Sequence, residues 1–301
     1  TKATYRRLPY LIKESAITYA PSATTFFDEL NLKNAKNNGR ILAFGPDYSI
    51  DNKALEQKDE NGKTLRTTLA NITNTQDEIK SLKEFFNVTA YLGKNATESA
   101  FKKNAGNYRV LHLAMHTIIN NENPLYSKLI LFKPQNDTID DGMLNASELI
   151  NMQLHADMAV LSACNTGSGK MSKGEGIMSL SRNFFYAGVP GIIMTAWAVE
   201  DRTGVKLMES FYKFLAMGKP RHEALRLAKI EYLENCDKLT SHPHYWASYM
   251  NVGDISPLEG FDKKNPPYVL YGTLAFLFLI SSVVVFRMIK KQNTDKPKSD
   301  L

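Results

Sequence analysis

Short apolar runs alternate with longer amphipathic segments along most of this chain. Nearly apolar runs lie at residues 40–44, 88–93, 109–115, 158–163 and 191–196. Between and after them, apolar residues recur every three to four positions at 75–86, 96–101, 176–187, 203–216 and 222–234. Runs of the first kind are typical of buried strands, and the second spacing is typical of helices. The alternation predicts an α/β fold, in which helices flank both faces of a mostly parallel sheet.

Weaker patterns predict the peripheral elements. Residues 10–12 and 16–19 are short enough for edge strands, whereas residues 51–68 are polar and predict a loop. Residues 129–132 and 141–144 predict a hairpin. We expect a short helix at 146–151 after it and a last strand at 245–252.

The C-terminal part of the chain carries a different signal. Residues 268–286 form a run of 19 residues without a charge, and a helix needs about 20 apolar residues to cross a bilayer. Pro266 and Pro267 prevent a helix of the body from continuing into this run. We expect a single transmembrane helix here, and a buried core helix is the alternative interpretation.

These patterns divide the chain into a body, a linker, a span and a tail. We expect the body at 1–257, with an N-terminal extension at 1–37 and a core at about 38–255. A linker at 258–267 and a basic tail at 287–301 flank the predicted span. The positive-inside rule predicts a cytoplasmic tail and an extracytoplasmic body, although a tail-anchored protein would show the same pattern. Because no secretory signal begins at Thr1, an export signal for such a body would have to precede it.

Composition argues against several classes of function. The net charge of +6 is mild, and no block of Lys and Arg interleaved with aromatic residues occurs in the body, so we expect no nucleic-acid partner. Cys164 and Cys236 are the only two cysteines, too few for a disulfide framework or a zinc site with four cysteine ligands. A single bridge between them stays open.

Candidate chemistry follows two of the predicted strands. His116 ends the strand at 109–115, and Cys164, which lies 48 residues after His116, ends the strand at 158–163. Parallel strands present functional groups at their carboxyl ends, so neighbouring strands would place the imidazole beside the thiol. An imidazole activates a thiol by accepting its proton. The Gly-rich residues 165–169 would turn backbone N–H groups toward an oxyanion, while a buried cysteine before a turn is the alternative.

His112 forms an H-x-x-x-H pair with His116, a spacing that binds metal when it occurs on a helix. On a strand, the two residues would lie about 13 Å apart, too far to share one ion. We therefore expect no metal site here. His112 is expected to be a hydrogen-bonded residue of the core.

Four further residues are candidates for a substrate pocket. Asp157, Glu175 and Asp201 would select a cationic side chain, and a solvated carboxylate in a turn is the alternative for each. Trp197 follows the strand at 191–196 and would form a wall of a substrate groove. A buried packing role is the alternative for Trp197.

Five motifs in a fixed order carry a family resemblance. They are YRVLHLAMH at 108–116, ADMAVLSACNTG at 156–167, KGEGIMSL at 173–180, AGVP at 187–190 and HPHYWA at 242–247. Together they resemble the CHAT domain family, caspase-like peptidases of clan CD that are often found behind tetratricopeptide repeats. The resemblance extends over most of residues 10–254. It implies a caspase-like fold with a mostly parallel sheet.

The resemblance also implies the roles of particular residues. The second histidine of the H-x-x-x-H strand and the cysteine of the S-A-C-x-T-G turn form a catalytic dyad in this family, and these positions are His116 and Cys164. Family members commonly have glycine after the catalytic histidine, whereas this chain has Thr117. Threonine keeps the N–H that would help to hold the oxyanion together with Cys164, but it restricts the backbone more than glycine.

From these observations we expect a membrane-anchored, caspase-like cysteine endopeptidase that needs no metal or organic cofactor. Its expected partners are a protein or peptide substrate, the lipid bilayer through residues 268–286, and an upstream repeat domain or regulatory protein. A catalytically silent interaction or signalling adaptor of the same family is the main alternative. A thiol-dependent transferase would use the same dyad and pass the acyl group to another nucleophile.

Overall fold

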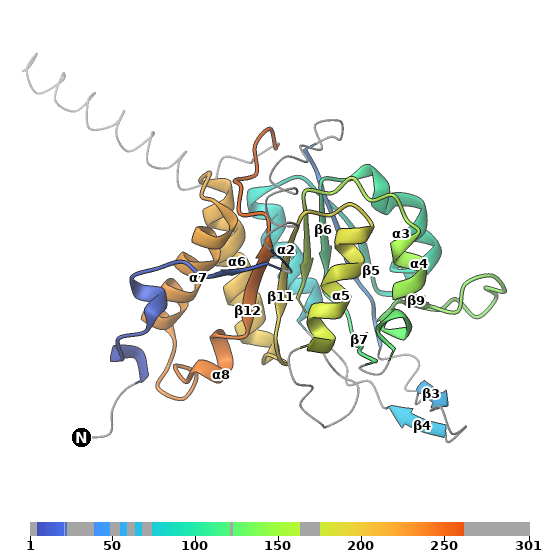
Figure 1. Cartoon of the computed structure of the whole chain (residues 1–301), viewed down its shortest axis with the longest axis horizontal. Helices are drawn as coiled ribbons and strands as arrows, with labels where there is room; N and C mark the ends of the chain where they lie inside the picture. The colour runs from blue at the N-terminus through green and yellow to red at the C-terminus, as the bar shows by residue number, and fades with distance from the viewer. Residues whose placement is uncertain are drawn as a thin grey trace, which may run out of the picture. The chain divides into compact units, whose positions relative to one another are not determined.

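The computed structural model describes residues 5–20, 22, 39–48, 55–58, 64–67, 74–120, 123–162 and 175–261, with the backbone alone at 55–58, 64–67 and 175–179. The chain separates into two units, Thr1–Lys263 and Lys264–Leu301. All described residues, which are those coloured in Figure 1, belong to the first unit.

A seven-stranded sheet forms the centre of this unit, in the order β1-β12-β11-β10-β6-β2-β5 (Figure 1). Its strands are β1 (Thr18–Tyr19), β2 (Ile41–Gly45), β5 (Val88–Leu92), β6 (Val110–Leu113), β10 (Met158–Leu161), β11 (Gly191–Thr195) and β12 (Tyr249–Gly253). All neighbouring strands are parallel except β11 and β12. This architecture confirms the prediction of a mostly parallel sheet.

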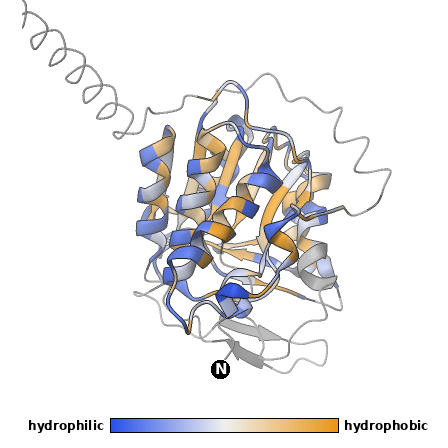
Figure 2. Ribbon diagram, turned by 90° about the vertical axis from the view of Figure 1, so that its left-hand side faces the viewer, coloured by the Kyte–Doolittle hydropathy of each residue, from blue (hydrophilic) through white to orange (hydrophobic). Residues whose placement is uncertain are grey.

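Helices cover both faces of the sheet, as the alternating pattern predicts (Figure 2). The helices of one face are α3 (Glu98–Asn104), α4 (Ala146–Ile150) and α5 (Glu175–Tyr186), and those of the other are α2 (Thr75–Phe85), α6 (Asp201–Ala216) and α7 (Arg221–Asn235). Successive strand residues point to opposite faces, so β10 buries Ala159 and Leu161 on the first face and Met158 and Val160 on the second. Each amphipathic helix covers one of these two apolar layers.

Smaller elements surround this core. A three-stranded antiparallel sheet contains β7 (Thr117–Ile118), β8 (Lys128–Ile130) and β9 (Met143–Asn145), and β3 (Leu55–Lys58) pairs with β4 (Thr64–Thr67). The remaining elements are the short helix α8 (Pro243–Trp246) and the 3-10 helices η1 (Tyr5–Arg7), η2 (Leu11–Lys13), η3 (Gly93–Asn95), η4 (Ala105–Asn107) and η5 (Pro124–Tyr126). The pairing of β8 with β9 confirms the predicted hairpin.

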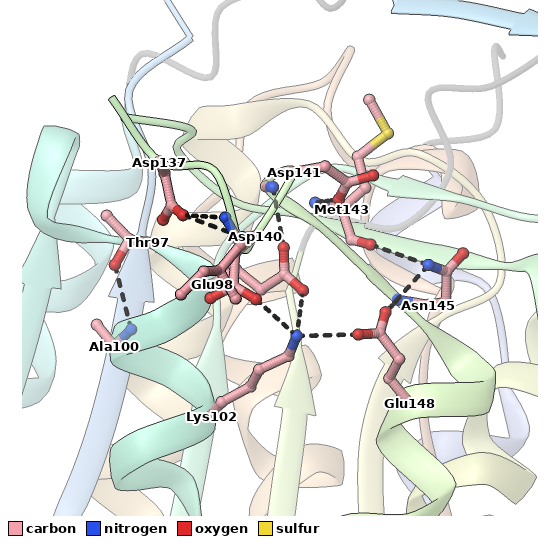
Figure 3. A network of polar contacts seen from close by, with 12 residues as sticks. Thr97, Glu98, Ala100, Lys102, Asp137, Asp140, Asp141, Met143, Asn145 and Glu148 are labelled. Carbon is pink, nitrogen blue, oxygen red and sulfur yellow. Dashed lines mark hydrogen bonds and ion pairs between the residues drawn. The ribbon is translucent and has the colours of Figure 1, made fainter. Parts of the chain in front are cut away.

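A network of charged side chains joins the β8–β9 connection to α3 and α4 (Figure 3). The Lys102 ammonium lies 2.7 Å from Glu98, 2.8 Å from Asp140 and 2.9 Å from Glu148. Glu98 is buried, and its other oxygen accepts a 2.9 Å hydrogen bond from the Gly142 N–H. One lysine therefore neutralises carboxylates from two helices and the loop between β8 and β9.

Three peripheral predictions need correction, and one short strand has no prediction. Residues 10–12 are not a strand, because η2 begins at Leu11, whereas residues 16–19 do contain the edge strand β1. The segment 51–68 is not wholly a loop, because it contains β3 and β4. The last strand begins at Tyr249, four residues later than predicted, because Pro243 is the first residue of α8, a position that favours proline. The sequence pattern does not predict β7 (Thr117–Ile118), which directly follows the apolar run at 109–115 and His116.

The described residues contain no helix long and apolar enough to span a membrane. The predicted span at 268–286 and the tail at 287–301 lie outside the described residues. Within the segment predicted as a linker, Leu258 and Phe261 are buried against the face formed by α2, α6 and α7.

Candidate functional site

The carboxyl ends of β2, β6, β10 and β11 lie at one edge of the central sheet, because these four strands are parallel. Three side chains follow these ends in the sequence. They are Tyr48 after β2, His116 after β6 and Trp197 after β11. Functional side chains of parallel sheets lie at this edge, where the carboxyl ends of the strands meet solvent.

The register of β6 and β10 aligns the two strand ends that precede His116 and Cys164 in the sequence. Leu113 and Leu161 are the last residues of the two strands and lie opposite each other. The Ser162 N–H donates a 3.1 Å hydrogen bond to the Leu113 carbonyl, which extends the pairing by one residue. His116 is three residues beyond Leu113, and Cys164 is three residues beyond Leu161. Cys164 itself lies outside the described residues, as do residues 165–169.

Hydrogen bonds fix both backbone groups of His116, its carbonyl and its N–H. Its carbonyl accepts a 3.0 Å bond from the Ile130 N–H on β8, and its own N–H donates a 3.0 Å bond to the Tyr48 hydroxyl. The side chain is buried, with 2% of the residue exposed. A rigid backbone limits the positions that the imidazole can reach.

Tyr48 is a contact of this site that the sequence analysis did not identify. Its hydroxyl donates a 2.7 Å hydrogen bond to the Ile130 carbonyl, and its ring lies 4.5 Å from the imidazole of His116 between centroids. Burial raises the pKa of Tyr48 well above its usual value, although the hydrogen bond from His116 opposes this, so the hydroxyl keeps its proton. The sequence signal was slight: a tyrosine follows a buried strand and its Gly45–Pro46 turn.

Thr117 begins β7 and is buried opposite Leu129 of β8. In an antiparallel pair, residues alternate between positions that point their N–H and carbonyl toward the partner strand and positions that point them away. Because His116 bonds to Ile130, the next residue points its backbone groups away from β8. The Thr117 N–H therefore points to the side of β7 that is opposite to β8.

Trp197 packs against the segment that contains α8. Its indole N–H donates a 2.8 Å hydrogen bond to the carbonyl of His244, and the two rings stack with centroids 6.2 Å apart. Trp197 is half-buried. Asp201 is half-buried and begins α6, while Glu175 begins α5 and its side chain lies outside the described residues.

Asp157 lies at the other edge of the sheet, because it precedes the first residue of β10. It is buried in an ion pair with Arg109, whose Nη2 lies 2.6 Å from the carboxylate. Burial raises the pKa of the Asp157 carboxyl, although Arg109 opposes this effect. The structure thus separates Asp157 from His116, Trp197 and Asp201.

His112 is a hydrogen-bonded core residue, which confirms the sequence-based interpretation. Its Nδ1 lies 3.1 Å from the Tyr212 hydroxyl and its Nε2 lies 3.0 Å from a carboxylate oxygen of Glu78. The side chain is fully buried on the face of the sheet that packs against α2 and α6. Within the described ranges, no three His, Cys, Asp or Glu side chains are arranged to hold a metal ion.

Comparisons with known proteins add relatives and structural neighbours. The chain is 27% identical to human tetratricopeptide repeat protein 28 over 135 residues, which are 44% of this chain and 5% of that protein. It therefore spans about a twentieth of the length of this curated relative. The structure of the Arg-specific cysteine proteinase gingipain R is 8% identical with a TM-score of 0.43, and the match covers 78% of this chain and 52% of that one. The complex of the pro- and mature domains of RgpB from Porphyromonas gingivalis is 9% identical with a TM-score of 0.44, covering 78% and 53%.

The family itself follows from the sequence over almost the whole body. The family description of the CHAT domain matches residues 2–254, which include the strands, the His116 segment and the Cys164 segment. This range contains all five motifs on which the resemblance rests. The chain belongs to the CHAT domain family.

Proposed function

We propose that this chain is a cysteine endopeptidase that uses His116 and Cys164 as its catalytic dyad. The observation that carries the proposal is the register of β6 and β10, which aligns the two strand ends; each dyad residue follows its strand end by three residues in the sequence. Membership of the CHAT domain family supports the same assignment, because its implied dyad falls on these two positions.

The proposed reaction divides into two acyl transfers. His116 accepts the proton of the Cys164 thiol, and the thiolate sulfur attacks the carbonyl carbon of the substrate peptide bond. The C–N bond then breaks, the leaving amine takes the proton from His116, and a thioester remains on Cys164. A water molecule gives a proton to His116 as its oxygen attacks the thioester carbon. The C–S bond then breaks, the acid leaves, and His116 returns the proton to the sulfur of Cys164.

The oxyanion of each tetrahedral intermediate needs hydrogen-bond donors. We assign this role to the backbone N–H groups of Thr117 and Cys164, and the direction of the Thr117 N–H away from β8 supports its part in it. Threonine has an N–H as glycine does, so its presence after His116 is compatible with the role. Trp197 and Asp201 follow the neighbouring strand β11 and are assigned to the substrate groove.

The proposal also includes attachment to a membrane, the class of substrate and a regulatory partner. Residues 268–286 anchor the chain in a bilayer with the basic tail in the cytoplasm, a proposal that rests on the absence of charge in this run and on the lysines and arginine after it. A protein or peptide is the substrate. The repeat-protein relative supports an upstream repeat domain as a regulatory partner.

Alkylation kinetics test the dyad without knowledge of the preferred substrate. The whole chain is treated with iodoacetamide, and modification of each cysteine is followed by mass spectrometry. Cys164 is expected to react much faster than Cys236, whose thiol is buried and has a pKa raised by that burial. His116→Ala is expected to slow the reaction at Cys164 about tenfold or more, because the proton acceptor is lost. His155→Ala, an exposed histidine, is the matched control.

Cleavage of a peptide library made from a digested proteome then tests the reaction itself. New termini are expected with the wild type and with Cys236→Ala, and not with Cys164→Ala. A Cys164 that reacts no faster than Cys236, together with no cleavage, would contradict the peptidase and favour the adaptor. Acyl transfer to an added amine in place of water would instead identify a transferase.

A further inference from the structure

The hairpin formed by β7 and β8 has an interruption at His116. Thr117 pairs with Leu129 and Ile118 with Lys128, so the same register places His116 opposite Ile130. In an antiparallel ladder, a hydrogen-bonded pair exchanges two bonds between its N–H and carbonyl groups. One of them is present, from the Ile130 N–H to the His116 carbonyl at 3.0 Å.

The hydroxyl of Tyr48 occupies the place of the other bond. The His116 N–H donates to this hydroxyl at 3.0 Å, and the hydroxyl donates to the Ile130 carbonyl at 2.7 Å. A tyrosine hydroxyl has one proton, which here goes to the carbonyl, so the oxygen is left to accept from His116. The side chain of Tyr48, which follows β2, is thereby inserted between His116 and Ile130, one position before the first pair of β7 and β8.

This insertion has two geometric consequences for His116. The hydroxyl lies between the N–H of His116 and the Ile130 carbonyl, so it links these two groups through two hydrogen bonds. The ring of Tyr48 also lies 4.5 Å from the imidazole at an angle of 47°, which restricts the rotation of the histidine side chain. Tyr48 is itself held by packing, because it forms an apolar cluster with Ile118, Ile130 and Met143.

We propose that Tyr48 is a positioning residue that sets the backbone and ring orientation of His116 for proton transfer with Cys164. The inference rests on the proposed function, and it adds a third side chain to the dyad. The hydroxyl acts on the peptide of His116, and the aromatic ring acts on its imidazole. Tyr48 does not touch the reacting atoms in this assignment.

The substitution Tyr48→Phe separates these two contributions, because it removes the hydroxyl and keeps the ring. The experiment uses the whole chain with ¹⁵N-labelled histidine, which gives one backbone amide signal for each of the six histidines. In Tyr48→Phe, the His116 amide signal is expected to shift, and its exchange with solvent is expected to become about tenfold faster or more, while the other five amides stay unchanged. The cleavage rate kcat is expected to fall about tenfold, with KM within twofold, because binding of the substrate does not involve the hydroxyl.

Tyr232→Phe is the matched control. Tyr232 is also buried, and its hydroxyl lies 3.1 Å from the Thr203 hydroxyl on a different part of the fold. This substitution is expected to leave kcat and the His116 amide unchanged. A general loss of stability on removal of a buried tyrosine hydroxyl would affect both variants, whereas the predicted fall in kcat occurs only in Tyr48→Phe.

The outcomes distinguish failure of this inference from failure of the proposed function. A folded Tyr48→Phe variant with wild-type kcat and an unchanged His116 amide would overturn the role of Tyr48. If Tyr48→Phe does not fold, the wild-type chain decides, because a His116 amide that exchanges as fast as one exposed to solvent contradicts the hydrogen bond. A wild-type chain without thiol-dependent cleavage would instead overturn the peptidase assignment. The amide measurements would still show whether the Tyr48 hydroxyl bonds to the His116 N–H.

Discussion

Lys229 on α7 is a charged side chain that the fold buries against backbone carbonyls. Its ammonium lies 2.6 Å from the carbonyl of Tyr249 and 3.5 Å from that of Ala247, and 9% of the residue is exposed. Burial lowers the pKa of Lys229 to about 8. The lysine thereby ties α7 to the first residue of β12 and to the turn before it.

This lowered pKa makes a prediction about stability at alkaline pH. An unfolded lysine titrates near pH 10.4, so between about pH 8 and that value the unfolded chain binds more protons at this position than the folded chain. The contribution of Lys229 to the free energy of unfolding therefore rises with pH, by at most about 1.4 kcal/mol per unit. The difference in unfolding free energy between the wild type and Lys229→Met, measured with denaturant at pH 8 and pH 9.5, is expected to rise by about 1–2 kcal/mol.

Lys238→Met supplies the control for this measurement, because Lys238 is an exposed lysine close to the end of α7. The corresponding difference for that variant is expected to stay constant across the same pH range. A constant difference for Lys229→Met as well would show that the ammonium is not disfavoured in the folded chain.

The residues of the candidate site differ in how clearly the sequence pattern predicts them. His116 and Cys164 both follow apolar runs, and the end of a buried run is a position that a single sequence makes visible. Tyr48 belongs to the loop after β2, and its partner Ile130 is 82 residues away in the chain. No local pattern records such a contact, because it depends on how the small sheet of β7 and β8 lies against the end of β2.

At the scale of elements, the network around Lys102 holds the connection between β8 and β9. The hydrogen bonds to Asp140, Glu98 and Glu148 raise the pKa of the Lys102 ammonium, although partial burial opposes them, so the group stays charged. Burial raises the pKa of Glu98 in spite of its contact with Lys102. Removal of the ammonium would leave the buried Glu98 carboxylate with the Gly142 N–H but without a cation, beside Asp140 and Glu148.

Lys102→Met is therefore expected to lower the free energy of unfolding by about 1–3 kcal/mol near neutral pH. Fully buried pairs lose about 3–5 kcal/mol when one partner is removed, and the estimate is smaller here because about a third of the Lys102 side chain is exposed. Denaturant unfolding measures the change, with Lys103→Met, the neighbouring exposed lysine, as the control within about 0.5 kcal/mol. An equal effect of the two substitutions would contradict a stabilising role of the Lys102 ion pairs.

The elements also show where sequence patterns predict structure and where they do not. The central strands β2, β6, β10 and β11 are predicted correctly, because strands buried on both faces are continuous apolar runs. The apolar run of β5 also predicts a strand, although β5 is at the edge of the sheet and its residues are half-buried. The start of β12 was predicted too early, since Tyr245 and Trp246 are apolar residues of α8 and resemble the strand that follows. The reversed direction of β12 relative to β11 leaves no sign in either pattern.

At the scale of the whole molecule, the body ends with contacts at the edge of the sheet opposite to His116. Arg109 precedes β6 and donates a 2.8 Å hydrogen bond to the carbonyl of Glu259, and its guanidinium lies 4.5 Å from the centre of the Phe261 ring. Arg221 forms a 3.0 Å ion pair with Asp254, just after β12. These contacts fix residues 254–261 on the body, close to the amino ends of β6 and β10.

The proposed membrane anchor can be tested on the whole chain by flotation with vesicles of phosphatidylcholine. The wild type is expected to float and to resist extraction with alkaline carbonate, because the run at 268–286 has the length of a bilayer-spanning helix. Leu277→Lys combined with Ile280→Lys places two charges in the middle of the run, each of which costs about 2.5–3.5 kcal/mol on insertion. This variant is expected to stay at the bottom of the gradient, whereas the apolar control Leu277→Phe with Ile280→Leu floats. Equal flotation of the two variants would exclude insertion of this run as the cause, and a wild type that does not float would favour a core helix that packs within the protein.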